Sequence, residues 1–181
     1  MFKMRHGCFE TNSSSMHSIV IMKDRKNADE YFESFLDKDG LLQIWSTSDL
    51  SFGRAPFEVL STFERKLCYA IASFGQKHFN ECVEIAKKYA VSRYGSTDGQ
   101  LRHCTGIKLP KSYYDDEKND YYGDVDHQSI GVLFSFLRNH NLTLEQFLAN
   151  PNYVVIIDGD EYCIFDTMRE IGLIDESNLT K

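Results

Sequence analysis

Hydrophobic positions in the middle of the chain recur every three or four residues, which predicts two consecutive helices. The first is expected to begin near Pro56, a residue that suits the first helical turn, and to end at Gly75. Its apolar stripe consists of Phe57, Leu60, Phe63, Leu67, Ile71 and Phe74. The second is expected from about Lys77 to Arg93. Its inward-facing positions are Phe79, Cys82, Val83, Ala86 and Ala90.

Three further helices are expected on either side of this pair. Residues 27–30 resemble the start of a helix that ends at Lys38, before the Asp39–Gly40 stop signal. Apolar residues return at helical spacing from Ser129 to Asn139. Residues 143–146 form a capping-box pattern, which indicates a short helix before Pro151.

Runs of β-branched and apolar residues predict the strands. Residues 16–22 and 41–46 are candidates, and residues 107–109 give a weaker signal. Residues 153–158 and 161–165 flank Gly159–Asp160, a pattern typical of a hairpin. Because helices and strands do not alternate regularly, we expect an α+β fold. The prediction is a single compact domain over residues 1–181, with helices packed on a small, mostly antiparallel sheet.

The composition is that of an ordinary globular protein, with 42% hydrophobic and 26% charged residues among 181. A formal charge of −7 disfavours a protein that wraps nucleic acid through a uniformly basic face. No apolar run approaches the roughly 20 residues of a membrane-spanning helix, and the N-terminus lacks an apolar signal region. The five cysteines are scattered, without a C-x-x-C pair. We therefore expect a cytoplasmic protein with reduced thiols and no membrane partner.

Most of the negative charge lies in residues 113–126, where six acidic side chains accompany a single lysine. They belong to an acidic, Tyr- and Asp-rich loop expected at 111–128. One interpretation is a solvated loop. The other is a binding surface whose tyrosines supply contact area and whose carboxylates meet the arginines of a phosphate-binding groove on a partner. The expected contact residues are Asp115, Asp116, Glu117, Asp120, Tyr121, Tyr122 and Asp124.

The N-terminal part has the opposite charge balance. Residues 1–26 carry five basic side chains and two acidic ones, which would allow a contact with nucleic acid. Within them, residues 9–18 concentrate serines, Thr11, Asn12, Glu10 and His17. These polar groups either hold a turn in place or bind an anion, with His17 as a base or ligand.

A second cluster, Asp126–His127–Gln128–Ser129, lies before a predicted helix. It is either a helix N-cap with a surface imidazole or part of an acid–base or metal site. If the two clusters meet in the fold, an enzyme acting on a nucleotide or a protein side chain would use Glu10, His17, Asp126 and His127. No glycine-rich nucleotide motif, zinc-protease motif or serine-hydrolase motif occurs. We therefore expect no cofactor and no metal.

Residues 5–18 resemble the N-terminal signature R-x-G-x-F-E-T-N-S-S-S-x-H-S of a group of phage and mobile-element proteins from gut bacteria. Residues 126–129 resemble a second block of that group, and the two blocks cover about a tenth of the chain. A chain of this size in the group is similar to the type II-A anti-CRISPR proteins, which inhibit the nuclease Cas9. The signature residues are Arg5, Phe9, Glu10, Thr11, Asn12, Ser13, Ser14, Ser15, His17 and Ser18.

The resemblance implies a non-enzymatic phage protein in the cytoplasm of a bacterial host. Its partner would be Cas9 or the Cas9–guide RNA complex, and it would hinder DNA engagement or cleavage by occupying that partner. The enzyme described above is the alternative function. A structural accessory protein of the phage, in which the signature only holds a turn, is the third.

Overall fold

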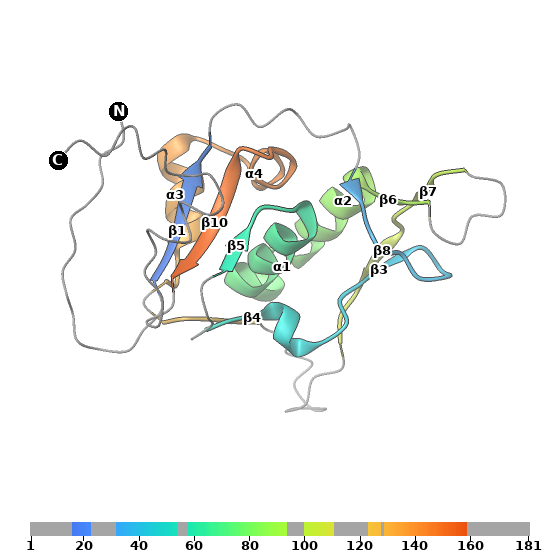
Figure 1. Ribbon diagram of the computed structural model, residues 1–181, viewed down its shortest axis with the longest axis horizontal. Coiled ribbons are helices and arrows are strands. Elements are labelled where there is room, and N and C mark those ends of the chain that lie inside the picture. The colour runs from blue at the N-terminus through green and yellow to red at the C-terminus, as the bar shows by residue number, and fades with distance from the viewer. Residues whose placement is uncertain are drawn as a thin grey trace, which may run out of the picture.

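The computed structural model describes residues 16–22, 32–53, 58–93, 100–110, 123–127 and 129–158. Within them, helices pack against small sheets, which confirms the α+β fold. Figure 1 shows a three-stranded sheet at one end of the molecule and shorter strands at the other. Helices α1 (Phe63–Phe74) and α2 (Phe79–Tyr89) lie between them.

The largest sheet is antiparallel and has the strand order β1-β10-β5. Its strands are β1 (Met16–Ile21), β10 (Tyr153–Asp158) and β5 (Glu58–Leu60). The central strand, β10, contains four consecutive β-branched residues at 154–157, a composition that suits a strand covered on both faces. All four are buried. These strands confirm the predictions for residues 16–22 and 153–158, whereas residues 161–165 lie outside the described residues.

Helix α1 begins later than the hydrophobic spacing predicts. Residues 58–60, expected in its first turns, form β5 instead, because pairing with β10 buries Leu60 in the sheet. The helix begins after Thr62, whose hydroxyl oxygen accepts a hydrogen bond from the N–H group of Arg65 (3.3 Å). It ends at Gly75, as predicted, where a φ of 58° favours glycine.

Helix α2 is also shorter than expected. The 3₁₀ helix η2 (Gly75–His78) precedes it, and β6 (Ala90–Ser92) replaces its last predicted turn. Cys82 faces the core, as predicted, and so does Cys68 on α1. Burial raises the pKa of both thiols to about 12, so they pack as small apolar side chains.

The helix expected up to Lys38 is wrong over its described part. Residues 32–33 form β2 (Phe32–Glu33), which pairs in parallel with β6, and Leu36 forms a bridge with Leu42. Tertiary pairing therefore overrides the local helical pattern. Residues 27–31 lie outside the described residues. Strand β6 also pairs with β7 (Arg102–His103), in the antiparallel sense.

Two parallel strand pairs complete the sheets. Strand β3 (Leu41–Gln43) pairs with β8 (Gly106–Lys108), at the positions that the sequence predicts for short strands. Strand β4 (Ser51–Phe52) follows the 3₁₀ helix η1 (Thr47–Leu50) and pairs with β9 (Asp124–Val125).

The last two helices lie close to the predicted positions. Helix α3 (Val132–His140) begins three residues after Ser129, because a turn with Gly131 at a φ of 85° precedes it. Helix α4 (Leu144–Ala149) has the predicted capping box. The Thr143 hydroxyl oxygen accepts from the N–H group of Gln146 (3.1 Å), and the Gln146 side chain accepts from the N–H group of Thr143 (2.9 Å).

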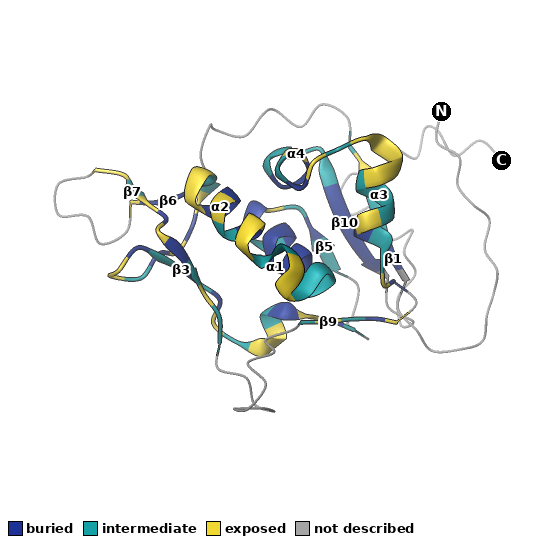
Figure 2. Ribbon diagram, turned by 180° about the vertical axis from the view of Figure 1, so that it is seen from behind, coloured by how far each residue is buried: buried dark blue, intermediate teal, exposed yellow. Residues whose placement is uncertain are grey.

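Helix α1 is the centre of the core, as its buried residues in Figure 2 show. Strand β9 approaches it through Gly123, where a Cβ atom would lie 2.2 Å from the carbonyl oxygen of Leu50 and 2.4 Å from Cβ of Ala72. Only glycine fits at this distance. The close approach brings the turn after β9, which contains Asp126, toward α1.

Candidate functional site

The two segments that the sequence singles out meet in the structure. His17 lies on β1, and Asp126 and Ser129 lie in the turn between β9 and α3. The N–H group of His17 donates a hydrogen bond to the hydroxyl oxygen of Ser129 (3.0 Å). The Asp126 carboxylate lies close enough to act on the charge of the His17 imidazole. All three residues are buried.

Helix α1 contributes the third part of this cluster. The hydroxyl oxygen of Tyr69 lies 3.2 Å from Nδ1 of His17, at hydrogen-bonding distance, and the two ring centroids are 5.6 Å apart. Tyr69 is completely buried, and burial raises its pKa to about 12, so the hydroxyl group keeps its proton. Phe52 packs edge-on against the Tyr69 ring, with centroids 5.2 Å apart.

The imidazole of His17 is held mainly in its neutral form. Only 4% of the residue is exposed, and burial lowers its pKa because the charged ring would lose its hydration. The Asp126 carboxylate and the backbone carbonyl of Phe52 act in the opposite direction, since both stabilise the imidazolium ion. Atom Nε2 is buried and has no hydrogen-bond partner among the described residues.

We refer to His17, Tyr69, Asp126 and Ser129 as the histidine cluster. Its members come from β1, α1 and the turn before α3, so it joins three parts of the fold. An aspartate, a histidine and two hydroxyl groups are also the components of an acid–base site. Their burial distinguishes the cluster from an open active site. It favours a structural role, in which the cluster holds β1 against α1.

His127 does not belong to the histidine cluster. Its side chain is 77% exposed, and its Nδ1 atom lies 3.7 Å from a carboxylate oxygen of Asp126. The surface-imidazole part of the prediction is therefore confirmed, but the N-cap part is wrong. The N-cap of α3 is Gly131, because the chain first forms a turn in which the N–H group of Ser129 donates to the carbonyl oxygen of Asp126 (2.8 Å).

The remaining predicted site residues divide into two groups. Ser18 is half-buried on β1, and Asp124 is exposed on β9. The others lie outside the described residues: Arg5, Phe9, Glu10, Thr11, Asn12, Ser13, Ser14 and Ser15 of the signature, and Asp115, Asp116, Glu117, Asp120, Tyr121 and Tyr122 of the acidic loop.

Sequence reasoning misses Tyr69, which lies 52 positions from His17. A tyrosine within an apolar helix is typical of a core residue. The signal that could have identified it is chemical, because a buried tyrosine hydroxyl requires a polar partner.

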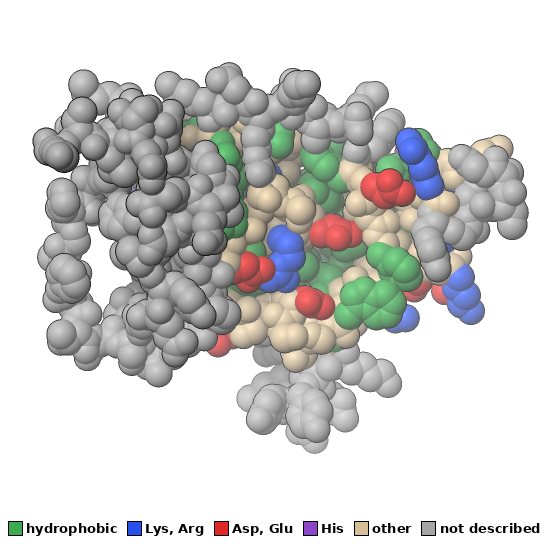
Figure 3. Space-filling view, in the orientation of Figure 1, with side chains coloured by type: hydrophobic (Ala, Val, Ile, Leu, Met, Phe, Trp, Pro, Cys, Tyr) green, Lys and Arg blue, Asp and Glu red, His purple; other side chains and the backbone are tan. Residues whose placement is uncertain are grey.

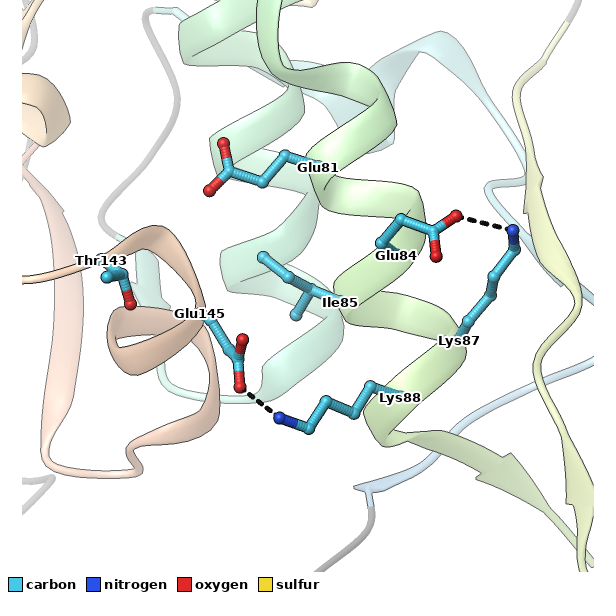
Figure 4. A pocket seen from close by; sticks show the side chains of 7 residues that line it. All are labelled: Glu81, Glu84, Ile85, Lys87, Lys88, Thr143 and Glu145. Carbon is cyan, nitrogen blue, oxygen red and sulfur yellow. Dashed lines mark hydrogen bonds and ion pairs between the residues drawn. The ribbon is translucent and has the colours of Figure 1, made fainter.

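A separate cavity of about 630 Å³ lies between α2 and α4 (Figure 4). Its charged side chains are paired: Nζ of Lys88 lies 2.6 Å from a carboxylate oxygen of Glu145, and Nζ of Lys87 lies 2.7 Å from one of Glu84. The hydrogen bond from Lys88 lowers the pKa of Glu145. Thr143 is used in the cap of α4. None of the predicted site residues lines this cavity.

No group of three or more His, Cys, Asp and Glu side chains in the described ranges is arranged to hold a metal ion. No helix in the same ranges has the length and apolar character needed to cross a membrane.

Comparison with models of protein families, with curated proteins and with solved structures gives no significant match to this chain.

Proposed function

We propose that this chain is a protein inhibitor that binds Cas9, in its guide-loaded form, and blocks DNA engagement or cleavage by occupying the enzyme. Residues 5–18 and 126–129 resemble the phage and mobile-element group, and a chain of this size in that group is similar to the type II-A anti-CRISPR proteins. This resemblance supplies the target. The observation that supports inhibition by binding is the burial of the histidine cluster. His17 comes from the signature, Asp126 and Ser129 come from the second block, and the fold buries all three.

Burial of these residues supports binding over catalysis for a physical reason. A catalytic histidine has to reach the proton it transfers, directly or through one water molecule. His17 is instead enclosed by Tyr69, Phe52 and Asp126, and its main-chain N–H group is bonded to Ser129. In this proposal the signature segment stabilises the fold that presents the binding surface.

Charge supports the choice of partner. The chain carries a formal charge of −7, whereas Cas9 holds its guide–target duplex in a positively charged channel. Asp124 is exposed on β9, at the end of the acidic segment that supplies the other proposed contact residues. Carboxylates spaced along such a segment would compete with phosphates for the arginines of the channel.

A cleavage assay in which Cas9, preloaded with guide RNA, is titrated with this protein tests the proposal. We expect inhibition that is complete near one inhibitor per Cas9 and does not grow with time of incubation. Absence of inhibition by the folded protein at large molar excess would show that the proposed target is wrong.

Matched charge reversals locate the contact. The double variant Asp115→Lys with Asp116→Lys is expected to weaken inhibition strongly. The control, Glu81→Lys with Glu84→Lys, changes the net charge equally at exposed positions of α2 and should inhibit like the parent protein. If both variants inhibit like the parent protein, the acidic loop is not part of the interface. That result would leave inhibition by occupation of Cas9 uncontradicted.

Catalysis is a second candidate, favoured by the contact of the signature with the second block at His17. An enzyme would act below one molecule per Cas9, and its effect would grow with time. It would also lose activity on His17→Gln substitution in a variant that still folds. The time course at a ratio well below one therefore separates the two functions.

A further inference from the structure

A pair of exposed aromatic side chains stands apart from the histidine cluster. Trp45, the single tryptophan of the chain, is 66% exposed, and Phe35 is 41% exposed. Their ring centroids are 5.1 Å apart, with the planes tilted by 50°. Large aromatic side chains that remain in water cost free energy, and tryptophan is enriched among the residues that dominate binding interfaces.

The backbone on which these two rings are mounted is held by hydrogen bonds. The N–H group of Gln43 donates to the carbonyl oxygen of Phe35 (3.3 Å), and the N–H group of Ile44 donates to the carbonyl oxygen of Lys108 (3.1 Å). The N–H group of Trp45 donates to a carboxylate oxygen of Asp49 (3.2 Å). The surface is therefore formed before any partner arrives, which reduces the entropic cost of binding.

Carboxylates surround the aromatic pair. A carboxylate oxygen of Asp49 accepts a hydrogen bond from the N–H group of Trp45, and one of Glu64 accepts a hydrogen bond from the N–H group of Phe35 (3.2 Å). Glu33, two residues before Phe35, is exposed. Within the described ranges none of these three acids forms an ion pair with a lysine or arginine. Figure 3 shows hydrophobic side chains exposed on this face of the molecule, with acidic and basic side chains beside them.

The basic side chains near this surface already have partners. Arg65 forms an ion pair with Glu58, and Lys108 lies 3.8 Å from a carboxylate oxygen of Asp37. Arg65 also donates to the carbonyl oxygen of Asp49 (3.3 Å), so one cation lies beside this border, although its ion pair is with Glu58. Glu33, Asp49 and Glu64 outnumber this one cation, and the border stays acidic. It would repel the phosphates of a nucleic acid and attract a cation.

We propose that Phe35, Trp45, Asp49 and Glu64 form a docking surface for an arginine side chain of a basic protein partner. A planar guanidinium stacks on an indole ring and donates to carboxylates at the same time, whereas a lysine ammonium has no flat face to stack. The inference rests on the proposed function, because the basic partner is taken to be Cas9. Its chemistry can also be tested without Cas9.

The single tryptophan makes a direct readout possible. Protein labelled with 5-fluorotryptophan gives one ¹⁹F resonance, from residue 45. We expect an arginine-only peptide to shift this resonance more than a lysine-only peptide of equal length and charge. Glu64→Gln keeps an acceptor for the Phe35 N–H group but removes the charge, and it should reduce the shift. If neither peptide moves the resonance, or both move it equally, the docking surface is wrong.

Binding to Cas9 then tests the identity of the partner. Trp45→Ser is expected to weaken the affinity for guide-loaded Cas9 by about tenfold or more. The control is Phe134→Ser, which removes an exposed aromatic ring from α3. Equal affinities of Trp45→Ser and parent protein would overturn the inference and leave the proposed function intact. If the parent protein fails to bind Cas9, the proposed function is wrong, and the peptide titration alone decides the docking surface.

Discussion

The position of His17 has a consequence that can be measured as pH changes. Burial lowers its pKa in the folded protein, so in the range below the ordinary value the unfolded chain binds more protons than the folded one. The contribution of His17 to the free energy of unfolding should therefore be most favourable above about pH 6.5 and should be lost progressively as the pH decreases. The loss from one histidine has an upper limit of about 1.4 kcal/mol per pH unit.

Urea unfolding of the parent protein and of His17→Gln between pH 7.5 and pH 5.5 would measure this effect, since glutamine does not titrate. We expect a steeper loss of stability in the parent protein. Equal slopes would mean that His17 titrates with an ordinary pKa. If His17→Gln does not fold, the His17 ring signals in an NMR titration of the parent protein give the pKa directly.

Part of this arrangement could be predicted from the sequence. His17, Asp126 and Ser129 were recognisable because polar groups are concentrated in two short segments. Their contact was not, since it depends on the register of β1 against β10 and on the close approach that Gly123 allows. The exposure of Trp45 could not be predicted from the sequence, for a similar reason. An indole ring in a short apolar run usually belongs to the core, and only the tertiary structure shows which face it occupies.

At the scale of elements, a buried lysine connects two helices. Lys66 of α1 is 1% exposed, and its Nζ atom donates to the carbonyl oxygens of Phe147 (3.0 Å) and Asn150 (2.8 Å) at the end of α4. It also lies over the Phe147 ring. A cation at a helix C-terminus satisfies the carbonyl groups that lack partners there and interacts favourably with the helix dipole.

Replacing this lysine with methionine keeps an unbranched side chain that is one atom shorter, but it leaves the carbonyl groups without their donor. We expect Lys66→Met to lower the free energy of unfolding by about 2–4 kcal/mol. Lys88→Met is the matched control, because Lys88 also reaches α4, through Glu145, but at the surface. It should change stability far less, since exposed ion pairs contribute little. Equal losses in chemical denaturation would contradict the role given to Lys66.

Element boundaries show where local patterns stop being informative. Leu60 and Phe63 are apolar and lie three residues apart, so their spacing predicts one continuous helix. Both are buried in the structure. In the fold Leu60 belongs to β5 and Phe63 to α1, because an extended segment can pair with β10. The capping box at α4 was predictable, since both of its hydrogen bonds join residues three positions apart.

At the scale of the whole molecule, the formal charge of −7 should determine how fast the protein meets its proposed partner. Opposite net fields steer two proteins together before they touch, and salt screens this attraction. Contacts inside the formed complex, such as stacking on Trp45, are screened much less. Salt should therefore act mainly on the association rate with guide-loaded Cas9.

Biolayer interferometry in low and high salt measures both rates. When NaCl rises from about 0.05 M to about 0.5 M, the Debye length falls about threefold. We expect the association rate to fall about tenfold and the dissociation rate to change by less than about twofold. Trp45→Ser should show the opposite pattern, with an ordinary association rate and faster dissociation. If salt leaves the association rate unchanged, the negative charge does not guide the encounter, and a contact through the basic residues 1–26 and the guide RNA becomes the better explanation.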